Sequence, residues 1–268
     1  MLKDITLGQY FPGDTVAHRL DPRTKLLLVI VYIVGLFNAV GWCSYAFVVV
    51  ITGLCMAVSK IRPAAAFKGL KPVIFIIILT ALLNIFYTKG TPIIEGWIIT
   101  WEGIEKAVMM SVRIILLIVG TFLLTYTTSP IALTDGLEIL LNPLKKIKVP
   151  VHEMSMMMSM ALRFIPTLIE ETDKIMSAQK ARGADFDTGN VFKRAKAMIP
   201  VLVPMFVSAF RRADELAFAL DARCYNATEN RTKMKKPRVT YRDFAGTFVT
   251  IGYVVVILLD SYVWLGVF

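Results

Sequence analysis

The chain has 268 residues, 56% of them hydrophobic, and a net charge of +10 from 30 Lys and Arg against 20 Asp and Glu. This is more apolar than a soluble globular domain, so the composition indicates a membrane protein. Basic residues accumulate at the cytosolic face of membrane proteins, which accounts for the positive charge. The sequence contains no zinc-ligand spacing, RNA-binding signature or basic zipper, so nucleic acid is not an expected partner.

An uncharged run at 26–59 predicts the first two membrane helices. As one helix, its 34 residues would be about 50 Å long, whereas the hydrocarbon core of a bilayer is about 30 Å thick. Asn38 and Gly41 supply a turn in the middle, so we expect helices near 25–40 and 43–59. Basic residues flank both ends of the run, which is typical of a hairpin that returns to the cytoplasm.

Three further membrane helices are predicted downstream, at 72–87, 104–126 and 244–268. The loop at 88–103 contains Gly, Pro and Trp residues with few charges, which suits the outer membrane interface. The chain is therefore predicted to have five membrane helices, a cytoplasmic N-terminus and an extracellular C-terminus. The polar N-terminal stretch is too long for the n-region of a signal peptide, so we expect no cleavage.

The segment 127–240 carries 18 Lys and Arg and 12 Asp and Glu, and it predicts a cytoplasmic domain. A short helix is expected near 130–141, followed by two amphipathic helices of about 30 residues each. Their stripes, spaced by three and four, are Met154, Met158, Ala161, Ile165, Leu168, Thr172 and Ile175, and then Ala195, Ile199, Leu202, Phe206, Ala209, Ala213, Leu216 and Leu220. The alternative is two more membrane spans, but Met198–Phe210 has 13 residues between basic flanks, whereas a span needs about 20.

The two amphipathic helices are predicted to end in the same way, in segments 41 residues apart. The first reads AQKARG at 178–183 and the second ALDARC at 219–224, and Asp173 and Asp214 share the offset. Arginine near a helix C-terminus is favoured by the helix macrodipole, and a small residue after it lets the chain turn away. Capping explains one such end, whereas the duplication predicts a partner with two-fold symmetry.

The chain contains no motif of a catalytic site. It has neither a phosphate-binding Gly-x-x-x-x-Gly-Lys-[Ser/Thr] loop nor a Gly-x-Ser-x-Gly nucleophile motif. His152 and Glu153 are not followed by the second His of a zinc protease, so we expect neither a metal nor a cofactor. The methionines at 154–160 are interpreted as adaptable packing residues. Three cysteines without CxxC spacing predict no disulfide framework.

Two charged residues fall inside the predicted membrane helices. Arg113 lies about 10 Å from the outer end of its helix, and Asp260 lies at a similar depth in the last helix. Charges in the membrane interior usually face the bundle and pair with one another. We therefore hypothesise an ion pair between these two residues, with Asn84 and Glu105 as competing partners.

The N-terminal motifs carry a family resemblance. They read GQYFPGDT at 8–15 and HRLDPRTKLL at 18–27, where Asp21 is expected to cap a helix and Pro22 to occupy its first position. Helix capping and turn formation do not explain the residues at 8–15. Together with the five-helix layout and the paired Ala-Arg-Gly-like endings, these motifs resemble the transmembrane T component of energy-coupling factor transporters, the vitamin-uptake systems of bacteria and archaea. The resemblance covers nearly the whole chain.

The expected fold is therefore an all-α polytopic membrane protein in three parts. Membrane helices occupy 1–126, a cytoplasmic coupling domain of two long crossed helices and a shorter one occupies 127–240, and the last membrane helix occupies 241–268. The resemblance implies two ABC-type ATPase subunits and a substrate-binding S component as partners in a bacterial cell membrane. It implies a non-catalytic subunit, because the ATPases hydrolyse ATP and the coupling helices transmit their motion to the S component.

Carried over residue by residue, the resemblance implies that the two helix ends enter grooves on the two ATPases. The residues involved are Ala181, Arg182 and Gly183 on one ATPase, and Ala222, Arg223 and Cys224 on the other. Arginine suits this role because its guanidinium makes bidentate bonds to carboxylates, which lysine cannot replace. Cys224 departs from the family, which has glycine there, and a left-handed turn is less favourable for cysteine.

Three alternatives stay open on the sequence. A T component dedicated to cobalt or nickel, or to a single vitamin, would share these motifs. A permease that binds substrate in its own bundle needs several inward-facing polar residues at mid-membrane, and only Thr80, Asn84 and Ser111 qualify. The third is a membrane-anchored interaction protein unrelated to transport. The sequence does not name the vitamin, because specificity would reside in the S component.

Overall fold

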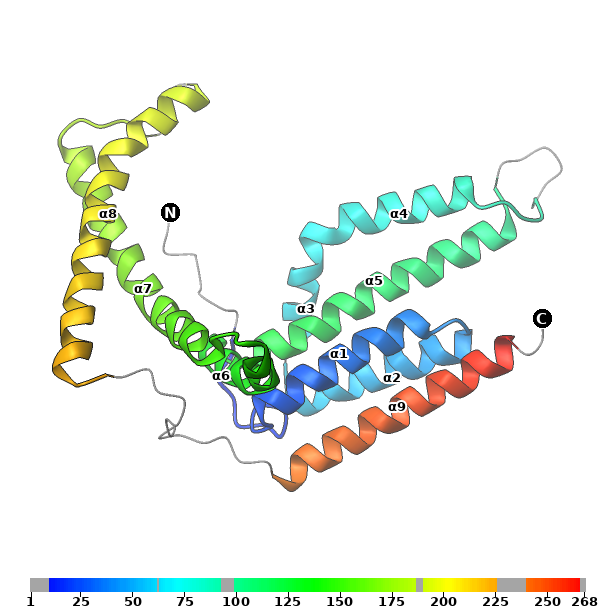
Figure 1. Cartoon of the computed structure of the whole chain (residues 1–268). Coiled ribbons are helices and arrows are strands. Elements are labelled where there is room, and N and C mark those ends of the chain that lie inside the picture. Colours follow the sequence, from blue (N-terminus) through cyan, green and yellow to red (C-terminus); the bar gives the residue numbers. More distant parts are fainter. Residues whose placement is uncertain (1–9, 62, 93–98, 187–189, 226–239, 266–268) are drawn as a thin grey trace. The chain divides into compact units, whose positions relative to one another are not determined.

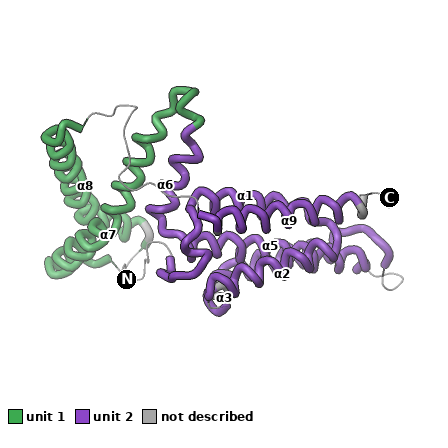
Figure 2. Tube along the Cα trace, turned by 90° about the horizontal axis from the view of Figure 1, so that it is seen from below, with its two compact units in different colours: residues 1–7, 143–236 green, residues 8–142, 237–268 purple. Residues whose placement is uncertain are grey.

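The protein is built from helices, as a computed structural model shows (Figure 1). The described residues are 10–61, 63–92, 99–186, 190–225 and 240–265. Across them, the only β-structure is an isolated bridge between Pro92 and Thr100, so the predicted all-α fold class is confirmed. Two compact units are distinguished in Figure 2: a membrane unit and a helix-pair unit. The membrane unit consists of residues 8–142 and 237–268, and the helix-pair unit consists of residues 1–7 and 143–236.

The membrane unit contains seven of the described α-helices. They are α1 (Pro22–Asn38), α2 (Trp42–Ser59), α3 (Pro63–Leu70), α4 (Ile74–Tyr87), α5 (Trp101–Thr127), α6 (Pro130–Leu140) and α9 (Tyr241–Leu265). Short 3-10 turns follow α3 at Lys71–Val73 and α6 at Asn142–Ile147. Each of the five predicted membrane helices corresponds to one of these helices, and the predicted short helix corresponds to α6.

In the described part of the chain, three helices are long and apolar enough to cross a membrane, namely Trp42–Ser59, Trp101–Thr127 and Asp243–Tyr262. By comparison, α1 has 17 residues and α4 has 14, whereas a full crossing needs about 20. The 3-10 turn before α4 lengthens that apolar segment to Lys71–Tyr87. The chain is therefore a membrane protein with several apolar helices, and the number of five spans stays a prediction.

Local signals in the sequence fix where the helices begin. The Asp21 carboxylate accepts a hydrogen bond from the backbone N–H of Arg23 at 3.0 Å, and Pro22 is the first residue of α1. Both features were predicted: the Asp21 carboxylate pairs an N–H group that the helix leaves free, and Pro22 has no N–H group to pair. Likewise, α2 begins directly after Gly41, where the sequence predicted the turn between the first two helices.

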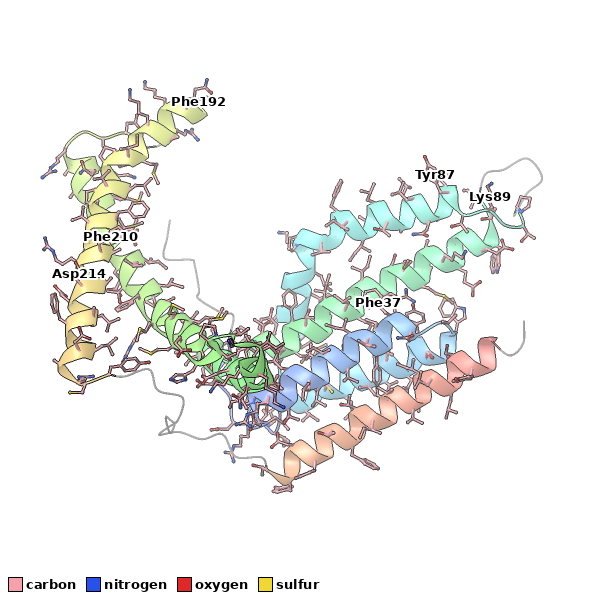
Figure 3. All side chains as sticks on the ribbon, viewed as in Figure 1. Phe37, Tyr87, Lys89, Phe192, Phe210 and Asp214 are labelled. Carbon is pink, nitrogen blue, oxygen red and sulfur yellow. The ribbon has the colours of Figure 1, made fainter. Side chains whose placement is uncertain are left out.

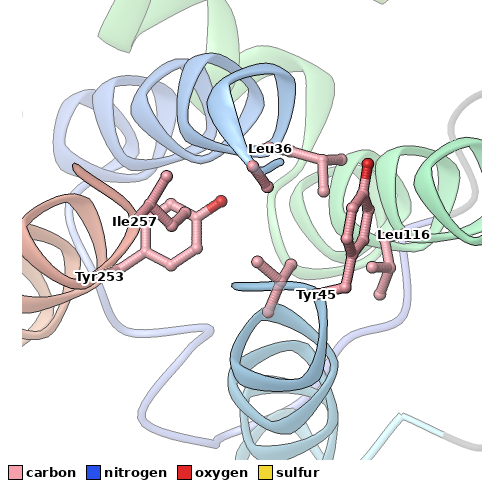
Figure 4. Packing of buried hydrophobic residues seen from close by; sticks show 7 residues of the cluster. Leu36, Tyr45, Leu116, Tyr253 and Ile257 are labelled. Atoms are coloured by element: carbon pink, nitrogen blue, oxygen red, sulfur yellow. The ribbon is translucent and has the colours of Figure 1, made fainter. Parts of the chain in front are cut away.

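A small aromatic and aliphatic core holds the membrane unit together. It comprises Leu36, Ala39, Tyr45, Val48, Leu116, Tyr253 and Ile257, which come from α1, α2, α5 and α9 (Figure 4). The Tyr253 ring stacks on Tyr32 at 5.8 Å between centroids, and its hydroxyl donates to the Tyr32 carbonyl at 3.0 Å. Glycine permits this packing, because a Cβ on Gly35 would lie 2.4 Å from Tyr253 Cε1.

A buried polar junction joins the first turn of α1 to the end of α5 and the start of α9. The Lys25 ammonium, on a residue that is 6% exposed, donates to the Thr127 carbonyl at 2.9 Å and the Thr128 hydroxyl at 3.1 Å. The Asp243 carboxylate accepts from the backbone N–H of Asp21 at 2.8 Å. Because these bonds tie the three helix termini together, α1 begins, α5 ends and α9 begins at one end of the membrane unit.

Two charged residues hold the opposite end of this unit, where α1 turns into α2. Arg113 on α5 donates to the Ala39 carbonyl and to the Tyr45 hydroxyl, both at 2.8 Å. Asp260 on α9 accepts from the backbone N–H of Ser44 at 3.2 Å and from its hydroxyl. The predicted ion pair between Arg113 and Asp260 is wrong, since each charge binds this turn instead.

The helix termini explain this outcome. The carbonyls at the end of α1 carry partial negative charge and the N–H groups at the start of α2 carry partial positive charge, so they offer a partner of opposite sign to each side chain. The competing partners proposed from the sequence are not used either. Glu105 accepts a hydrogen bond from Trp42 Nε1 at 2.7 Å, and Asn84 donates to the carbonyl one turn earlier in its own helix.

Within the N-terminal segment 8–15, which local sequence left unexplained, residues 8 and 9 lie outside the described residues, and Phe11 packs on the end of α5. The Phe11 N–H donates to the Tyr126 carbonyl at 3.1 Å, and the two rings meet edge to face at 5.4 Å. His18 closes the turn that follows, because its ring nitrogens bond Thr15 Oγ1 at 2.6 Å and the Phe11 carbonyl at 3.0 Å. A Cβ on Gly13 would lie 3.0 Å from the His18 ring, so glycine allows this close approach.

We predict that Gly35→Ala destabilises the membrane unit by about 1–3 kcal/mol, because the added methyl group displaces the buried Tyr253 ring. Gly252→Ala on α9 is the matched control, since a Cβ there meets nothing within 4 Å. The control should be neutral or slightly stabilising, as alanine favours helices over glycine. Thermal unfolding of the purified protein in detergent measures both effects, and equal midpoints for the two variants would contradict the packing described here.

Candidate partner-docking site

The helix-pair unit contains two long helices, α7 (Val151–Ala181) and α8 (Val191–Ala222). They have 31 and 32 residues, and each ends at the alanine of its Ala-Arg motif. Prolines lie inside both helices, at Pro166 in α7 and at Pro200 and Pro204 in α8. The two long helices predicted from apolar periodicity are therefore confirmed.

The two helix ends have the same backbone geometry. The Gly183 N–H donates to the carbonyl three residues earlier at 3.0 Å, and the next N–H donates to the carbonyl five residues before it at 3.0 Å. At the second helix end, the Cys224 N–H and the Tyr225 N–H repeat these two bonds, each at 2.9 Å. This pattern is a Schellman motif, which requires a left-handed residue after the helix. Gly183 has φ 88° and Cys224 has φ 51°, so cysteine adopts the turn that the sequence predicted to be unfavourable for it.

The predicted docking residues are exposed at both ends. All six belong to this group: Ala181, Arg182, Gly183, Ala222, Arg223 and Cys224. Within the described part of the chain, neither the Arg182 nor the Arg223 guanidinium forms a hydrogen bond or ion pair. The structure brings each triplet together at its own helix end, and it does not bring the two triplets to one place.

The two helices cross at residues that are equivalent in the duplication. Arg212 donates to the Glu171 carboxylate at 2.7 Å, Ser208 also donates to it, and Glu171 and Arg212 are 41 residues apart. Farther along α7, Gln179 donates to the Pro200 carbonyl at 3.4 Å, so the partner residues in α8 have decreasing numbers as those in α7 increase. The helices are therefore antiparallel, and the Glu171–Arg212 pair lies on a pseudo-two-fold axis.

This symmetry places the two arginine-bearing ends on opposite sides of the crossing (Figure 1). Arg182 lies eleven residues after Glu171, and Arg223 lies eleven residues after Arg212. Each end is thus about 16 Å along its helix from the crossing. Tyr225, just after the second end, donates to Met156 Sδ at 2.6 Å, which places that end beside the first turns of α7.

Sequence reasoning missed Glu171 and Arg212, although the offset of 41 residues relates them. The hydrogen bond from Ser208 and the positive charge of Arg212 lower the pKa of the Glu171 carboxyl below its ordinary value of 4.5. Both side chains keep some exposure, 23% for Glu171 and 35% for Arg212. An ion pair of this kind contributes about 0.2–1 kcal/mol to the stability of the folded protein. It therefore determines where α7 and α8 cross more than how tightly they are held together.

Large apolar side chains stand out from both helices, and Figure 3 shows Phe192 and Phe210 pointing away from α8. The exposed set is Met154, Met157, Met158, Phe192, Met198, Ile199, Leu202, Val203, Phe206, Val207, Phe210 and Phe218. Contiguous exposed apolar surface of this kind marks a protein or membrane contact. Among the described residues, no three His, Cys, Asp or Glu side chains lie close enough to hold a metal ion.

Comparison with known proteins identifies the class of this membrane protein. The model of the CbiQ family, described as cobalt transport protein, matches residues 13–234. The energy-coupling factor transporter transmembrane protein EcfT of Ruminiclostridium cellulolyticum is 51% identical over 267 residues, which are 98% of this chain and all of the relative. The proteins of the same name from Clostridium kluyveri and Bacillus subtilis are 50% and 47% identical, over 99% and 97% of this chain and 100% and 98% of theirs.

These matches define a membrane component of a transport system. More particularly, the chain belongs to the family of energy-coupling factor transporter transmembrane proteins, the T components of these transporters. The resemblance stated from the N-terminal motifs and the paired arginine endings is confirmed.

We predict that Gly183→Ala and Cys224→Gly change the stability of the two helix ends in opposite directions. Gly183→Ala forces alanine into a left-handed turn and costs about 1 kcal/mol, whereas Cys224→Gly relieves a similar cost. Hydrogen exchange measures this directly, because the amide of the residue after the turn should lose or gain about fivefold protection. Gly53→Ala is the control, since Gly53 is helical and its added Cβ has open space. Unchanged exchange in Gly183→Ala would rule out the strained turn.

We predict a pH-dependent contribution from the helix crossing. Because the pKa of Glu171 is lowered in the folded protein, its stabilisation is complete above about 4.5 and is lost as the pH falls through the lowered value. Wild type should exceed Glu171→Gln in stability by about 1 kcal/mol at neutral pH, and the difference should vanish in acid. Thermal unfolding from pH 7 downwards measures it, with the exposed Glu170→Gln as control. A difference that persists at the acid end would contradict this role.

Proposed function

We propose that this chain couples two ABC-type ATPase subunits to a substrate-binding S component and thereby drives vitamin uptake. The observation that carries the proposal is the pair of equivalent, exposed arginine ends on opposite sides of the α7–α8 crossing. A partner that matches them needs two equivalent sites separated by no more than about 33 Å, since each arm is about 16 Å long. A pair of similar ATPase subunits meets this requirement.

Each helix end would dock through its arginine. Arg182 and Arg223 leave helix termini where the backbone is partially negative, and their exposed guanidinium groups are available for bidentate bonds to carboxylates on the ATPases. ATP-driven closure of the ATPase pair would move the two ends with respect to each other. Because long helices are stiff, the motion would be passed along α7 and α8 through their crossing.

The S component would contact the exposed apolar surface of the helix pair. That surface includes three methionines near the start of α7, at 154, 157 and 158, and methionine side chains adapt to changing partners. The apolar surface thus suits an interface that changes during a transport cycle. The bound vitamin would be held by the S component, and the T component would remain non-catalytic.

The polar junction supports the proposed orientation in the membrane. It ties the start of α1, the end of α5 and the start of α9 to one end of the membrane unit. The end of α5 and the start of α9 therefore lie on the same side of the membrane unit as the start of α1. With the excess of Lys and Arg in 127–240, this side is proposed to be cytoplasmic, which gives a cytoplasmic N-terminus and an extracellular C-terminus.

A metal-uptake role is the second candidate, because the matching family model is described as a cobalt transport protein. The curated relatives at 47–51% identity are named for energy-coupling factor transport and not for cobalt. Uptake assays with radiolabelled vitamins and with Co²⁺ or Ni²⁺, in cells expressing the co-purifying S component, separate the two. Accumulation of metal but no vitamin would replace the vitamin assignment.

We predict that Arg182→Ala and Arg223→Ala each weaken ATPase association by about tenfold to a hundredfold, because each removes charge-assisted bonds worth about 1.5–3 kcal/mol. The double variant should abolish uptake while the protein still inserts into the membrane. Arginine-to-lysine variants should recover only part of the binding, since lysine lacks the planar fork. Co-purification of the ATPases and vitamin uptake measure these effects.

The control for this experiment is Arg211→Ala, which removes an exposed arginine from α8 away from either end. Its ATPase association and uptake should match wild type. Normal uptake by the double Arg182/Arg223 variant would refute the docking role of the helix ends.

A further inference from the structure

An apolar groove enters the membrane unit between α1, α2, α5 and α9. It has a volume of about 570 Å³, which is in the range of pockets that bury a small-molecule ligand. Among the described residues that line it, Lys25 carries the only charge. The coupling function proposed above assigns no role to this groove.

The groove is lined by one half of α2 and one half of α9. These helices are joined at one end, where Asp260 bonds Ser44, while the residues of both helices that line the groove lie toward the other end. Ser59 and Tyr241 line the end of the groove beside the polar junction, and we call this end its mouth. The stacked Tyr32 and Tyr253 rings mark its inner limit.

The depth of the groove matches one leaflet of a bilayer. Tyr241 at the mouth and Tyr253 at the inner limit are twelve residues apart on α9, or about 18 Å. Half of a hydrocarbon core of about 30 Å is about 15 Å. A groove that starts at the membrane interface and ends near the bilayer midplane has the dimensions of an acyl chain.

A second cavity of about 800 Å³ continues from the mouth of the groove. The two share Val16, Val58 and Ser59 in their linings, and the second is lined mainly by the polar turn at 11–18 and by Lys60. This cavity is more polar than the groove. The two together form one site with an apolar part and a polar part, which is the chemistry of an amphiphile.

The charges of the site favour an anionic headgroup. Lys25 is hydrogen-bonded to neutral oxygens only, and within the described residues the side chain of Lys60 has no hydrogen bond or ion pair. Asp14 is the only carboxylate in either lining, and Arg19 lies 3.6 Å from it. The Asp243 carboxylate lies close enough to Lys25 to interact with its charge, so Lys60 is the lysine left without an anion among the described residues, beside the mouth, where phospholipid headgroups lie.

We propose that this site binds one anionic glycerophospholipid of the adjacent leaflet. Its acyl chains occupy the groove up to the stacked tyrosines, and its phosphate lies at Lys60. The lipid fills the space between α2 and α9 at the end where α5 leaves the membrane unit and α9 returns. It thereby stabilises the part of the membrane unit from which both connections to the helix-pair unit depart.

The test is lipid retention by the purified full-length protein. After delipidation in detergent, the protein is incubated with phosphatidylglycerol or phosphatidylcholine, washed, and analysed by native mass spectrometry. Wild type should retain one phosphatidylglycerol and less phosphatidylcholine. Lys60→Gln should weaken phosphatidylglycerol retention about fivefold, the effect of one basic residue at an anionic surface. Lys89→Gln, at an exposed lysine outside both linings, is the control and should retain lipid as wild type does.

Variants that fill the groove test the acyl part. Ala245→Phe on α9 and Ala17→Phe before α1 each add a ring to the lining and should lose both lipids. Gly252→Phe adds the same ring on α9 where there is open space, and it should retain them. Two groove-filling variants from different elements guard against a failure of either one to fold. The proposal would be overturned if both groove-filling variants retained lipid as wild type does. It would also be overturned if inorganic phosphate alone displaced the bound lipid as well as added phosphatidylglycerol does. Because no ATPase or S component takes part, the outcome is independent of the coupling function.

Discussion

The buried junction of Lys25 and Asp243 is the constraint on which the rest of this structure depends. It brings together the starts of α1 and α9 and the end of α5, which all lie more than one hundred residues apart from one another in the chain. A buried charge that loses its partners is strongly destabilising, so the three termini have one favourable arrangement. That arrangement places the end of α5 and the start of α9 on a single side of the membrane unit.

Local signals made most of the helical structure predictable. The uncharged run, interrupted by Asn38 and Gly41, gave the α1–α2 hairpin, and Asp21 with Pro22 gave the start of α1. Apolar periodicity predicted two helices of about 30 residues from the stripes at 154–175 and 195–220, and these stripes lie within α7 and α8. These features depend on neighbours within a few positions, so no knowledge of the tertiary fold was required.

The partners of charged residues were not predictable in the same way. Arg113 and Asp260 were expected to pair, but the folded hairpin presents a helix C-terminus to one and a helix N-terminus to the other. Those partners exist only once α1 and α2 have formed and packed. The function of Phe11 was hidden for a similar reason, because its partner Tyr126 lies more than one hundred residues away. The Glu171–Arg212 pair could have been predicted, because the two residues are related by the same offset of 41 residues that relates the two helix ends.

The helix pair combines stiff arms with a weakly held crossing. Each arm is closed by a Schellman motif, which pairs the last carbonyls and keeps the arginine-bearing end from fraying. At the crossing, the Glu171–Arg212 pair is partly exposed to water and contributes little net energy. In the proposed mechanism this balance is required, because the arms must transmit force while the angle between them changes. A deeply buried ion pair would resist that change, whereas a solvated one can break and re-form as the two ends move.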